Sequence, residues 1–446
     1  MFRWKKYIVA GLLIVLLMNG LAVQVRAKEP TETELYAKAA VLMDAESGRV
    51  LYEKNGQEIL ANASTTKILT CILALETAHL EEWVDISAYA STMPKVKLGI
   101  TKGERYRLGD LLHSLMLESH NDVAVAIAEH VGKEFLEKEL AEKSASEYTA
   151  EESKKAVAAF ADLMNEKAQE LGCESSWFIT PNGLDATETF HAKDGSTFSK
   201  DHSTTAEELA RIMSYCVLHS PKKEEFLEIT QTISYTVTSE KGRNHFCTNH
   251  NAFLTMMEGV ISGKTGFTNK AGYCYVGALE RDGRTFVVAL LACGWPNNKS
   301  YKWHDSKILL KYGTEEFLKK SIEDAEKESR IPAQILVING QTSEMGRPAF
   351  AGVKVVPAET EEGIWSKAEN VLLKEGEAVQ FEYELPEKLE APVNKGDIVG
   401  KLTYSVDGNI YRQKDIVLTE DVKKVDFKWC FEKVFDIYLG GNTQIE

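Results

Sequence analysis

Residues 61–67 read Ala61-Asn62-Ala63-Ser64-Thr65-Thr66-Lys67, and apolar side chains follow them at positions 68, 71, 72 and 75. This spacing predicts a helix with one buried face that begins near Ser64. Ser64 and Lys67 then lie one turn apart on the same side, where the lysine amine can take the serine proton. Backbone N–H groups left unpaired at the helix start could also hold an oxyanion. An N-capping serine beside a surface lysine is the alternative, because Ser220-Pro221-Lys222-Lys223 fits the same S-x-x-K pattern.

The N-terminal segment has the layout of a secretory signal peptide. Basic residues at positions 3, 5 and 6 precede an apolar run from Ile8 to Val23, and Val25-Arg26-Ala27 offers small residues for cleavage. The run is short for a membrane span, although an uncleaved anchor is the alternative. We therefore predict an exported protein from which residues 1–27 are removed.

The composition of the 446-residue chain limits its partners and cofactors. The formal net charge is −15, and an acidic surface argues against nucleic acid as a partner. Seven cysteines are scattered without C-x-x-C spacing, so neither a metal site nor another cofactor is predicted. We expect most cysteines to be buried as small apolar residues, without a disulfide framework.

Periodicity divides the rest of the chain into a large domain, residues 28–329, and a small all-β domain, residues 330–424. The large domain mixes helical and strand patterns, which indicates an α+β or α/β class. Residues 133–158 are rich in Lys, Glu, Ala and Ser, which favours a solvated helical insertion. The small domain has short alternating segments between Gly, Pro and Asn turns. The segments predicted in the large domain are hairpins at 39–52 and 273–293, strands at 233–237 and 260–266, and helices at 108–117, 123–131, 160–171, 204–217 and 303–327.

Two further motifs follow S-x-x-K in order along the chain. Ser119-His120-Asn121 is the only S-x-N and lies at the predicted break between two helices. Lys264-Thr265-Gly266 is the only K-T-G and lies in a predicted strand. Together the three motifs are the signature of penicillin-binding proteins and class A β-lactamases.

The sequence around these motifs resembles the D-alanyl-D-alanine carboxypeptidases, the low-molecular-mass penicillin-binding proteins of bacterial cell walls. The resemblance covers nearly all of the chain after residue 27. It implies an α+β, penicilloyl-transferase/β-lactamase-like domain, in which an antiparallel sheet of five strands is flanked by helices. A small all-β domain follows. The segments that carry the resemblance are residues 63–68, 163–168, 181–184, 263–268 and 391–396.

The resemblance implies three catalytic residues, and chemistry explains their roles. Ser64 attacks the carbonyl between the last two D-alanines and forms an acyl-enzyme. Lys67 has to be a neutral amine to act as the base, and burial beside the positive Lys264 favours that form. Ser119 passes the proton to the leaving D-alanine amine.

Five further residues are implied to bind the substrate. The Asn121 amide can hold both an N–H and a C=O of the peptide. Lys264 and Thr265 can bind the terminal carboxylate. Gly266 lets the peptide lie along the strand edge, and the N–H groups of Ser64 and Phe267 form the oxyanion hole. The ligands implied are peptidoglycan stem peptides and β-lactam antibiotics.

Other interpretations remain open at this stage. Ser119 and Asn121 could be simple turn residues, Thr265 an ordinary strand residue, and His120 a spacer where the family often has glycine. A β-lactamase is disfavoured because the Glu-x-x-Leu-Asn motif of class A enzymes is absent from the sequence. A catalytically silent penicillin-binding or sensor protein is disfavoured by the three intact motifs, whereas DD-endopeptidase activity stays possible.

The C-terminal segment, residues 425–446, carries apolar residues at helical spacing, Phe427, Phe431, Val434, Phe435 and Tyr438. A short amphipathic helix could lay this face on a membrane surface. The alternative is packing against the β domain or another subunit, since the charged residues of the segment do not form a basic face. We expect peripheral attachment to the outer face of the cytoplasmic membrane, close to the cell wall.

Overall fold

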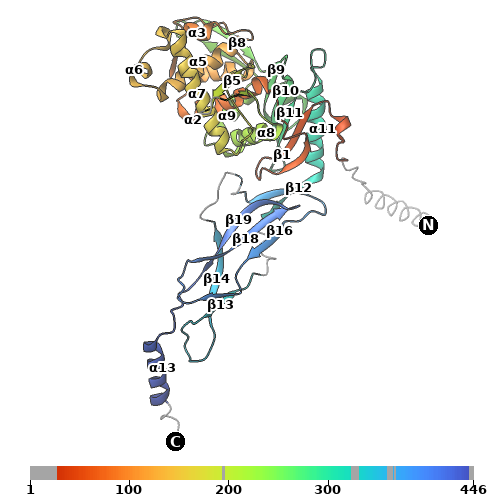
Figure 1. The fold of residues 1–446 in the computed structure, drawn as a ribbon. Helices are drawn as coiled ribbons and strands as arrows, with labels where there is room; N and C mark the ends of the chain where they lie inside the picture. The colour runs from red at the N-terminus through yellow and green to blue at the C-terminus, as the bar shows by residue number, and fades with distance from the viewer. Residues whose placement is uncertain (1–27, 193–195, 323–330, 359–364, 366–367, 441–446) are drawn as a thin grey trace, which may run out of the picture.

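The computed structural model describes residues 28–440 except 193–195, 323–330, 359–364 and 366–367 (Figure 1). The predicted signal peptide lies outside the described residues, as does the end of the C-terminal segment, residues 441–446.

A five-stranded antiparallel sheet forms the centre of the large domain, in the order β2-β1-β11-β10-β9. Its first strand therefore pairs with a strand that comes more than 200 residues later, with Val41 opposite Ala289. This confirms the antiparallel sheet that the family resemblance implied. The strands are β1 (Ala39–Asp44), β2 (Val50–Lys54), β9 (Val260–Thr268), β10 (Gly272–Arg281) and β11 (Arg284–Leu291).

Helices cover both faces of this sheet. Successive strand residues point to opposite faces, so Leu42 packs with the residues of α11, while Val41 packs with the larger helical cluster. Figure 1 shows α11 on one side of the sheet and the other helices across it. The long helices are α2 (Lys67–Thr77), α4 (Leu108–Leu117), α5 (Asn121–Gly132), α7 (Ala150–Glu170), α8 (Ala206–Ser214), α9 (Lys223–Gln231) and α11 (Tyr301–Glu316).

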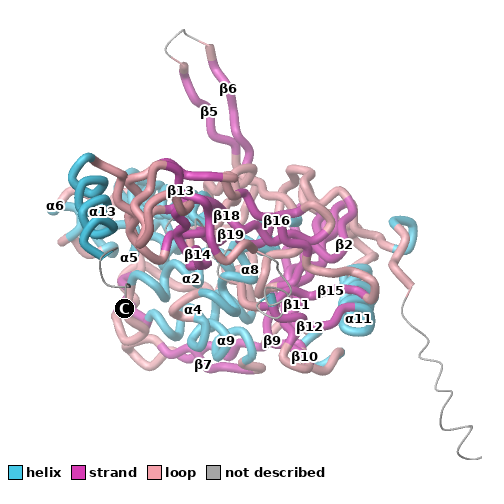
Figure 2. Tube along the Cα trace, turned by 90° about the horizontal axis from the view of Figure 1, so that it is seen from below, coloured by secondary structure: helices cyan, strands magenta, loops and turns pink. Residues whose placement is uncertain are grey.

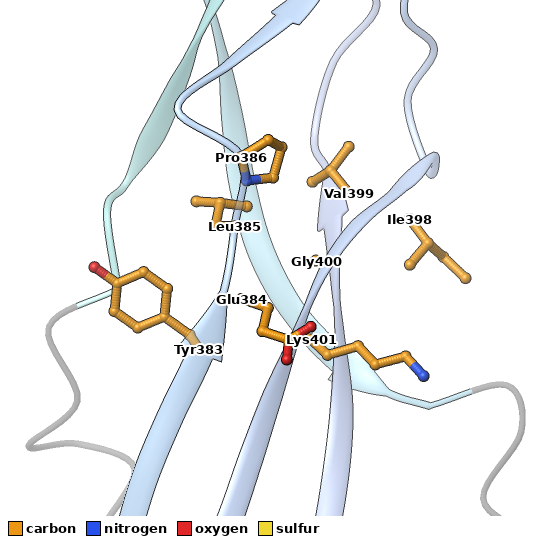
Figure 3. Close-up of a pocket in the computed structure, with 8 residues that line it drawn as sticks. All are labelled: Tyr383, Glu384, Leu385, Pro386, Ile398, Val399, Gly400 and Lys401. Carbon is orange, nitrogen blue, oxygen red and sulfur yellow. The ribbon is translucent and has the colours of Figure 1, made fainter.

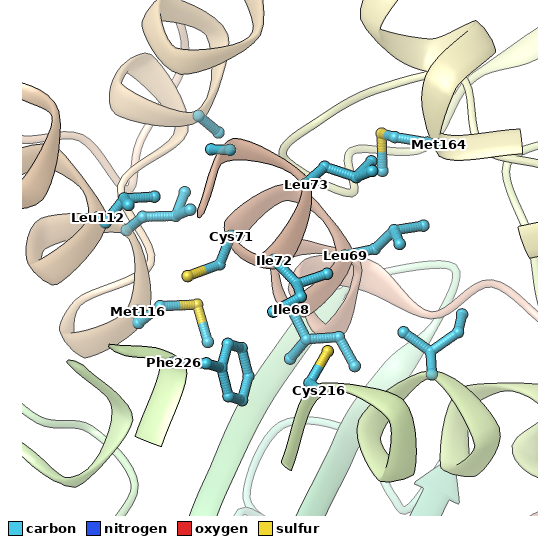
Figure 4. Close-up of a cluster of buried hydrophobic side chains, with 14 of the residues drawn as sticks. Ile68, Leu69, Cys71, Ile72, Leu73, Leu112, Met116, Met164, Cys216 and Phe226 are labelled. Carbon is cyan, nitrogen blue, oxygen red and sulfur yellow. The ribbon is translucent and has the colours of Figure 1, made fainter. Parts of the chain in front are cut away.

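Helix α2 lies in the middle of the helical cluster. A 3₁₀ turn, η2 (Ala63–Thr66), precedes it, and every residue from Lys67 to Leu75 is buried. The prediction of a single buried face is therefore wrong. Side chains from several other helices surround α2, among them Leu112, Met164 and Phe226 (Figure 4). An apolar helix in this position needs no solvent-facing side.

The structure corrects two helix predictions. The helix predicted at 303–327 ends at Glu316, and Phe317–Ser321 form β12, which pairs with β15 (Asn370–Lys374). Leu318 and the lysines beside it favour a helix locally, but pairing with β15 and burial of Phe317 decide the outcome. The helix predicted at 160–171 begins at Ala150, because Thr149 and Glu152 form a capping box.

The predicted insertion is less solvated than expected. Its first half forms the short turns η3 (Lys133–Phe135), α6 (Lys138–Ala141) and η4 (Ala145–Glu147), and its second half belongs to α7. Ala145, Tyr148 and Ala156 make a small core of their own against Leu136 and Leu140. Three short antiparallel pairs complete the domain. They are β3 (Trp83–Asp85) with β4 (Arg105–Arg107), the projecting hairpin of β5 (Thr187–His191) and β6 (Thr197–Asp201) seen in Figure 2, and β7 (Ser234–Thr238) with β8 (Asn244–Thr248).

The C-terminal part is all-β, as predicted, and is built on a six-stranded sheet. A partly buried salt bridge and a buried hydrogen bond join it to the large domain. Arg49 lies 2.8 Å from Glu377, and the Asp44 carboxylate accepts the Leu372 N–H. An open groove at one end of the sheet is lined by Leu385, Val399 and their neighbours (Figure 3). The strands are β13 (Gln334–Ile338), β14 (Ala349–Pro357), β16 (Gln380–Glu384), β17 (Lys388–Glu390), β18 (Ile398–Val406) and β19 (Asn409–Leu418).

The C-terminal segment forms the helix α13 (Phe427–Gly440), which stands at the far end of the β domain from the large domain (Figure 1). Most of its large apolar residues are exposed, and the Phe427, Phe431 and Phe435 rings stack along one side. None of the helices in the described ranges is both long enough and apolar enough to cross a membrane.

Candidate active site

The three motifs meet at one cleft of about 400 Å³ beside the start of α2. Five of the eight predicted site residues line it, namely Ser64, Ser119, Thr265, Gly266 and Phe267. The other three, Lys67, Asn121 and Lys264, are buried behind this lining. The fold thus brings together S-x-x-K, S-x-N and K-T-G from three separate parts of the chain.

The Lys67 amine makes three polar contacts. Its Nζ lies 2.8 Å from Ser64 Oγ, 3.0 Å from Asn121 Oδ1 and 2.6 Å from the Asn182 carbonyl oxygen. The last two oxygens can only accept hydrogen bonds, and a neutral amine has only two N–H groups. The amine lone pair therefore faces Ser64, the one partner of the three that can donate a proton.

Burial and charge favour the neutral amine. The Lys67 pKa is held well below its ordinary range, chiefly because the amine is desolvated and also because Lys264 is close; Asp122 acts in the opposite direction. This agrees with the sequence-based expectation that Lys67 is neutral. Lys264 is itself fully buried, and desolvation lowers its pKa to about 7.

A network of polar side chains holds the 3₁₀ turn that carries Ser64. Thr66 Oγ1 donates to the Ala63 carbonyl oxygen and accepts from Asn62 Nδ2 at 2.9 Å. His202 Nδ1 accepts the Ile179 N–H at 3.0 Å, so its Nε2 carries the proton and donates to Thr66 Oγ1 at 2.8 Å. The network supports a strained turn, because Ala63 has a φ of +49°.

Gly183 lets the loop that carries Asn182 approach this turn. Its φ is +77°, and a Cβ there would lie 1.9 Å from the Ala63 carbonyl oxygen. A larger residue would push the Asn182 carbonyl away from the Lys67 amine. The loop therefore fixes one of the three partners of the base.

Ser119 and Asn121 lie where α4 gives way to α5. Ser119 has a φ of +69°, and its buried Oγ has no hydrogen-bond partner among the described residues. A buried hydroxyl left without a partner is costly, so this group has unused capacity for a hydrogen bond to a bound molecule. The Asn121 N–H donates to the Val96 carbonyl oxygen at 2.7 Å, which ties this segment to the loop that precedes β4.

Strand β9 forms the wall beside Ser64. A Cβ on Gly266 would lie 2.9 Å from the Ser64 backbone nitrogen, so only glycine lets the strand come this close. The packing of the protein therefore requires glycine at position 266, whether or not a substrate also lies along the strand. The close approach also places the Ser64 N–H beside the strand that carries Phe267, as an oxyanion hole requires.

Sequence reasoning missed several residues around the cleft. Asn182 and His202 were not singled out, although residues 181–184 were among the family-like segments. The same cleft is also lined by Tyr273, Lys299, Lys302 and Trp303, and no motif pointed to them. Lys302 Nζ donates to the Lys299 carbonyl oxygen at 2.6 Å, and burial lowers its pKa to about 8.

The fold and this site define a serine hydrolase of the penicillin-recognising class. A family model described as D-alanyl-D-alanine carboxypeptidase matches residues 24–138 and 141–292, and one described as penicillin-binding protein 5, C-terminal domain, matches residues 360–424. The chain therefore belongs to the D-alanyl-D-alanine carboxypeptidase family, whose members are serine-type hydrolases.

Individual proteins agree with this assignment. D-alanyl-D-alanine carboxypeptidase DacF of Bacillus subtilis is 25% identical over 435 residues, which cover 96% of each chain. DacB2 of Mycobacterium tuberculosis is 29% identical over 57% of this chain and 74% of its own. The crystal structure of penicillin-binding protein 5 from Haemophilus influenzae matches in fold, with a TM-score of 0.60, 22% identity, and coverage of 89% of this chain and 99% of that one.

Proposed function

We propose that this protein removes the terminal D-alanine from peptidoglycan stem peptides through an acyl-enzyme on Ser64. The observation that carries the proposal is the contact between Ser64 Oγ and the buried Lys67 amine. Of the three groups that this amine contacts, only the Ser64 hydroxyl can donate a proton to its lone pair. Lys67 takes the hydroxyl proton while Oγ bonds to the carbonyl carbon. The carbonyl oxygen becomes an oxyanion beside the Ser64 and Phe267 N–H groups.

The tetrahedral intermediate collapses when the C–N bond to the last D-alanine breaks. Ser119 gives its hydroxyl proton to the leaving amine and takes the proton held by Lys67, which leaves the lysine neutral again. The peptide stays on Ser64 as an ester. Water then attacks the ester carbonyl, with the same lysine as base, and regenerates the hydroxyl. Penicillin enters the same route because its lactam amide and carboxylate occupy the places of the D-Ala-D-Ala amide and carboxylate.

The proposal is tested by incubating the purified protein with a soluble peptide ending in D-Ala-D-Ala and measuring released D-alanine. Release is expected, together with one penicillin adduct per chain in intact-mass spectra. Rapid turnover of penicillin with no release of D-alanine would instead indicate a β-lactamase. Cleavage of a cross-linked peptide dimer, assayed in parallel, would reveal endopeptidase activity.

Replacing Lys264 by alanine should remove the preference for a free C-terminal carboxylate. The lost charge-assisted hydrogen bond is of the order of about 1.5–3 kcal/mol, or roughly 10- to 150-fold in kcat/KM. Kinetics with matched peptides, one with a free and one with an amidated C-terminus, measure this preference. Ser119→Ala is the control, since it should slow both peptides alike. A wild-type preference in Lys264→Ala would exclude the carboxylate role.

The pH profile of kcat/KM should be bell-shaped. Activity rises as Lys67 loses its proton, and the lowered pKa of Lys67 moves this rise well below the ordinary range of lysine. Activity then falls above pH about 7 as free Lys264 loses the charge that attracts the carboxylate. The fall should be absent with the amidated peptide. An identical fall for both peptides would assign it to another group.

We also propose that the protein is exported and works in the cell wall, close to the outer face of the cytoplasmic membrane. The basic and apolar pattern of residues 1–27 supports export. Helix α13 supports attachment, because Phe427 is 85% exposed and the stacked rings of Phe431 and Phe435 continue the same face. Such a face suits the boundary between lipid head groups and acyl chains.

Deleting residues 425–446 should leave activity on soluble peptide unchanged and release the protein from lipid vesicles. The measurement is a flotation assay with vesicles, using the chain without residues 1–27 as reference. Phe431→Glu should weaken flotation in the same way, whereas Phe350→Ser, which removes an exposed ring from the β domain, should not. Failure of the reference protein to float would refute membrane attachment.

A further inference from the structure

Three metal-ligating side chains lie together next to the S-x-N motif. They are Glu118, His120 and Cys247, and their ligand atoms all lie within 4.8 Å of one another. Glu118 follows the last residue of α4, His120 is the middle residue of Ser119-His120-Asn121, and Cys247 belongs to β8. The peptidase mechanism described above uses none of the three.

Hydrogen bonds to neighbouring groups orient the His120 and Glu118 side chains. His120 Nδ1 is hydrogen-bonded to Ser114 Oγ at 2.7 Å, which leaves Nε2 to face Glu118. Glu118 Oε1 accepts the Thr248 N–H at 2.8 Å, which leaves Oε2 to face His120. Metal-binding histidines and carboxylates are commonly fixed in this way by a hydrogen bond to their other polar atom.

The spacing of the His120 and Glu118 ligand atoms suits a shared ion. His120 Nε2 and Glu118 Oε2 are 3.3 Å apart, which is longer than a strong charge-assisted hydrogen bond of about 2.7–2.9 Å. Two ligands on a tetrahedral zinc ion, each bonded at about 2.0–2.1 Å, are separated by about 3.3 Å. The third ligand, Cys247, is completely buried, whereas Glu118 lines the cleft, so the cluster meets solvent through Glu118.

We propose that Glu118, His120 and Cys247 bind one divalent ion of the zinc class beside the catalytic cleft. A donor set of one oxygen, one nitrogen and one sulfur favours zinc or cobalt over magnesium or calcium. The Cys247 thiol gives up its proton to solvent when its sulfur bonds to the ion. Glu118 and Ser119 both line the cleft, so an ion and a water ligand can reach the cluster from that side. The ion would link β8 to the segment that carries Ser119.

Cobalt titration of the metal-stripped full chain tests this site. We expect one equivalent of Co²⁺ to bind, with a thiolate-to-cobalt charge-transfer band that one equivalent of Zn²⁺ abolishes. Cys247→Ala should lose the band, while Cys173→Ala, which alters a buried cysteine outside the cluster, should keep it. Ser114→Ala removes the partner of His120 and should weaken binding by about 10- to 100-fold.

Two controls keep the test decisive. Labelling by a fluorescent penicillin shows whether Cys247→Ala is folded, because acylation needs the whole cleft. His120→Gly deletes a second ligand and places at this position the glycine that is common in the family. A charge-transfer band that persists in Cys247→Ala, or unchanged binding in His120→Gly, overturns the proposal, as does wild-type protein that binds Co²⁺ without the band.

Discussion

Replacing Ser64 by alanine should abolish both penicillin labelling and release of D-alanine. Among the described residues, Ser64 supplies the one hydroxyl that contacts the Lys67 amine, so the other contacts of the base offer no group that could be acylated instead. Loss of a serine nucleophile in other hydrolases costs roughly 10⁶-fold in kcat. Intact-mass spectrometry after incubation with penicillin measures the adduct directly, and D-alanine release measures turnover.

The chain offers a matched control for this substitution. Ser220 belongs to the second S-x-x-K sequence, but it precedes α9, its Oγ donates to Glu76, and it is not among the residues that line the cleft. Ser220→Ala should therefore keep the adduct and the activity. An adduct that persists in Ser64→Ala would show that another residue is acylated.

Replacing Lys67 by arginine should reduce the acylation rate by about 10²- to 10⁴-fold, the usual contribution of a positioned general base. Arginine keeps the positive charge but stays protonated, so it cannot take the Ser64 proton. The measurement is the rate of labelling by a fluorescent penicillin under single-turnover conditions. Thermal unfolding of the same sample shows whether the larger side chain has been accommodated.

Lys223→Arg, in the second S-x-x-K sequence, is the control because its effect on acylation should be negligible. Lys67→Ala completes the series by removing the base without adding volume. If Lys67→Arg is folded and acylates at close to the wild-type rate, the proton goes to another group and the proposed mechanism is wrong.

Much of the fold followed from local pattern, and the exceptions have physical causes. The hairpin around Asp282-Gly283 and the helices α4 and α5 were predicted because their periods and turn residues agree with their tertiary environment. The segment from Phe317 to Ser321 was missed because its helical preference is overridden by pairing with a strand 50 residues away. The local sequence pattern does not indicate which distant strand a segment will pair with.

The candidate site likewise contains residues that could be predicted from the sequence and residues that could not. The three motifs could be found in the sequence because their spacing carries the chemistry. The Asn182 carbonyl could not, since any residue supplies a carbonyl and only the fold brings this one to Lys67. The lowered pKa of Lys264 depends on complete burial, which a strand pattern does not specify. Glu118 and Cys247 approach each other only because β8 lies beside the end of α4.

The burial of α2 on every side has a consequence for how the protein opens. Amide hydrogens exchange with solvent when their hydrogen bonds break, and regions with many buried contacts open only when most of the molecule unfolds. Helix α2 lies in the largest core cluster, so its amides belong with the most slowly exchanging part of the domain. Lys67 is the first residue of this helix, and Ser64 lies in the 3₁₀ turn that directly precedes it. The nucleophile and its base thus stay assembled through the local fluctuations that open surface loops.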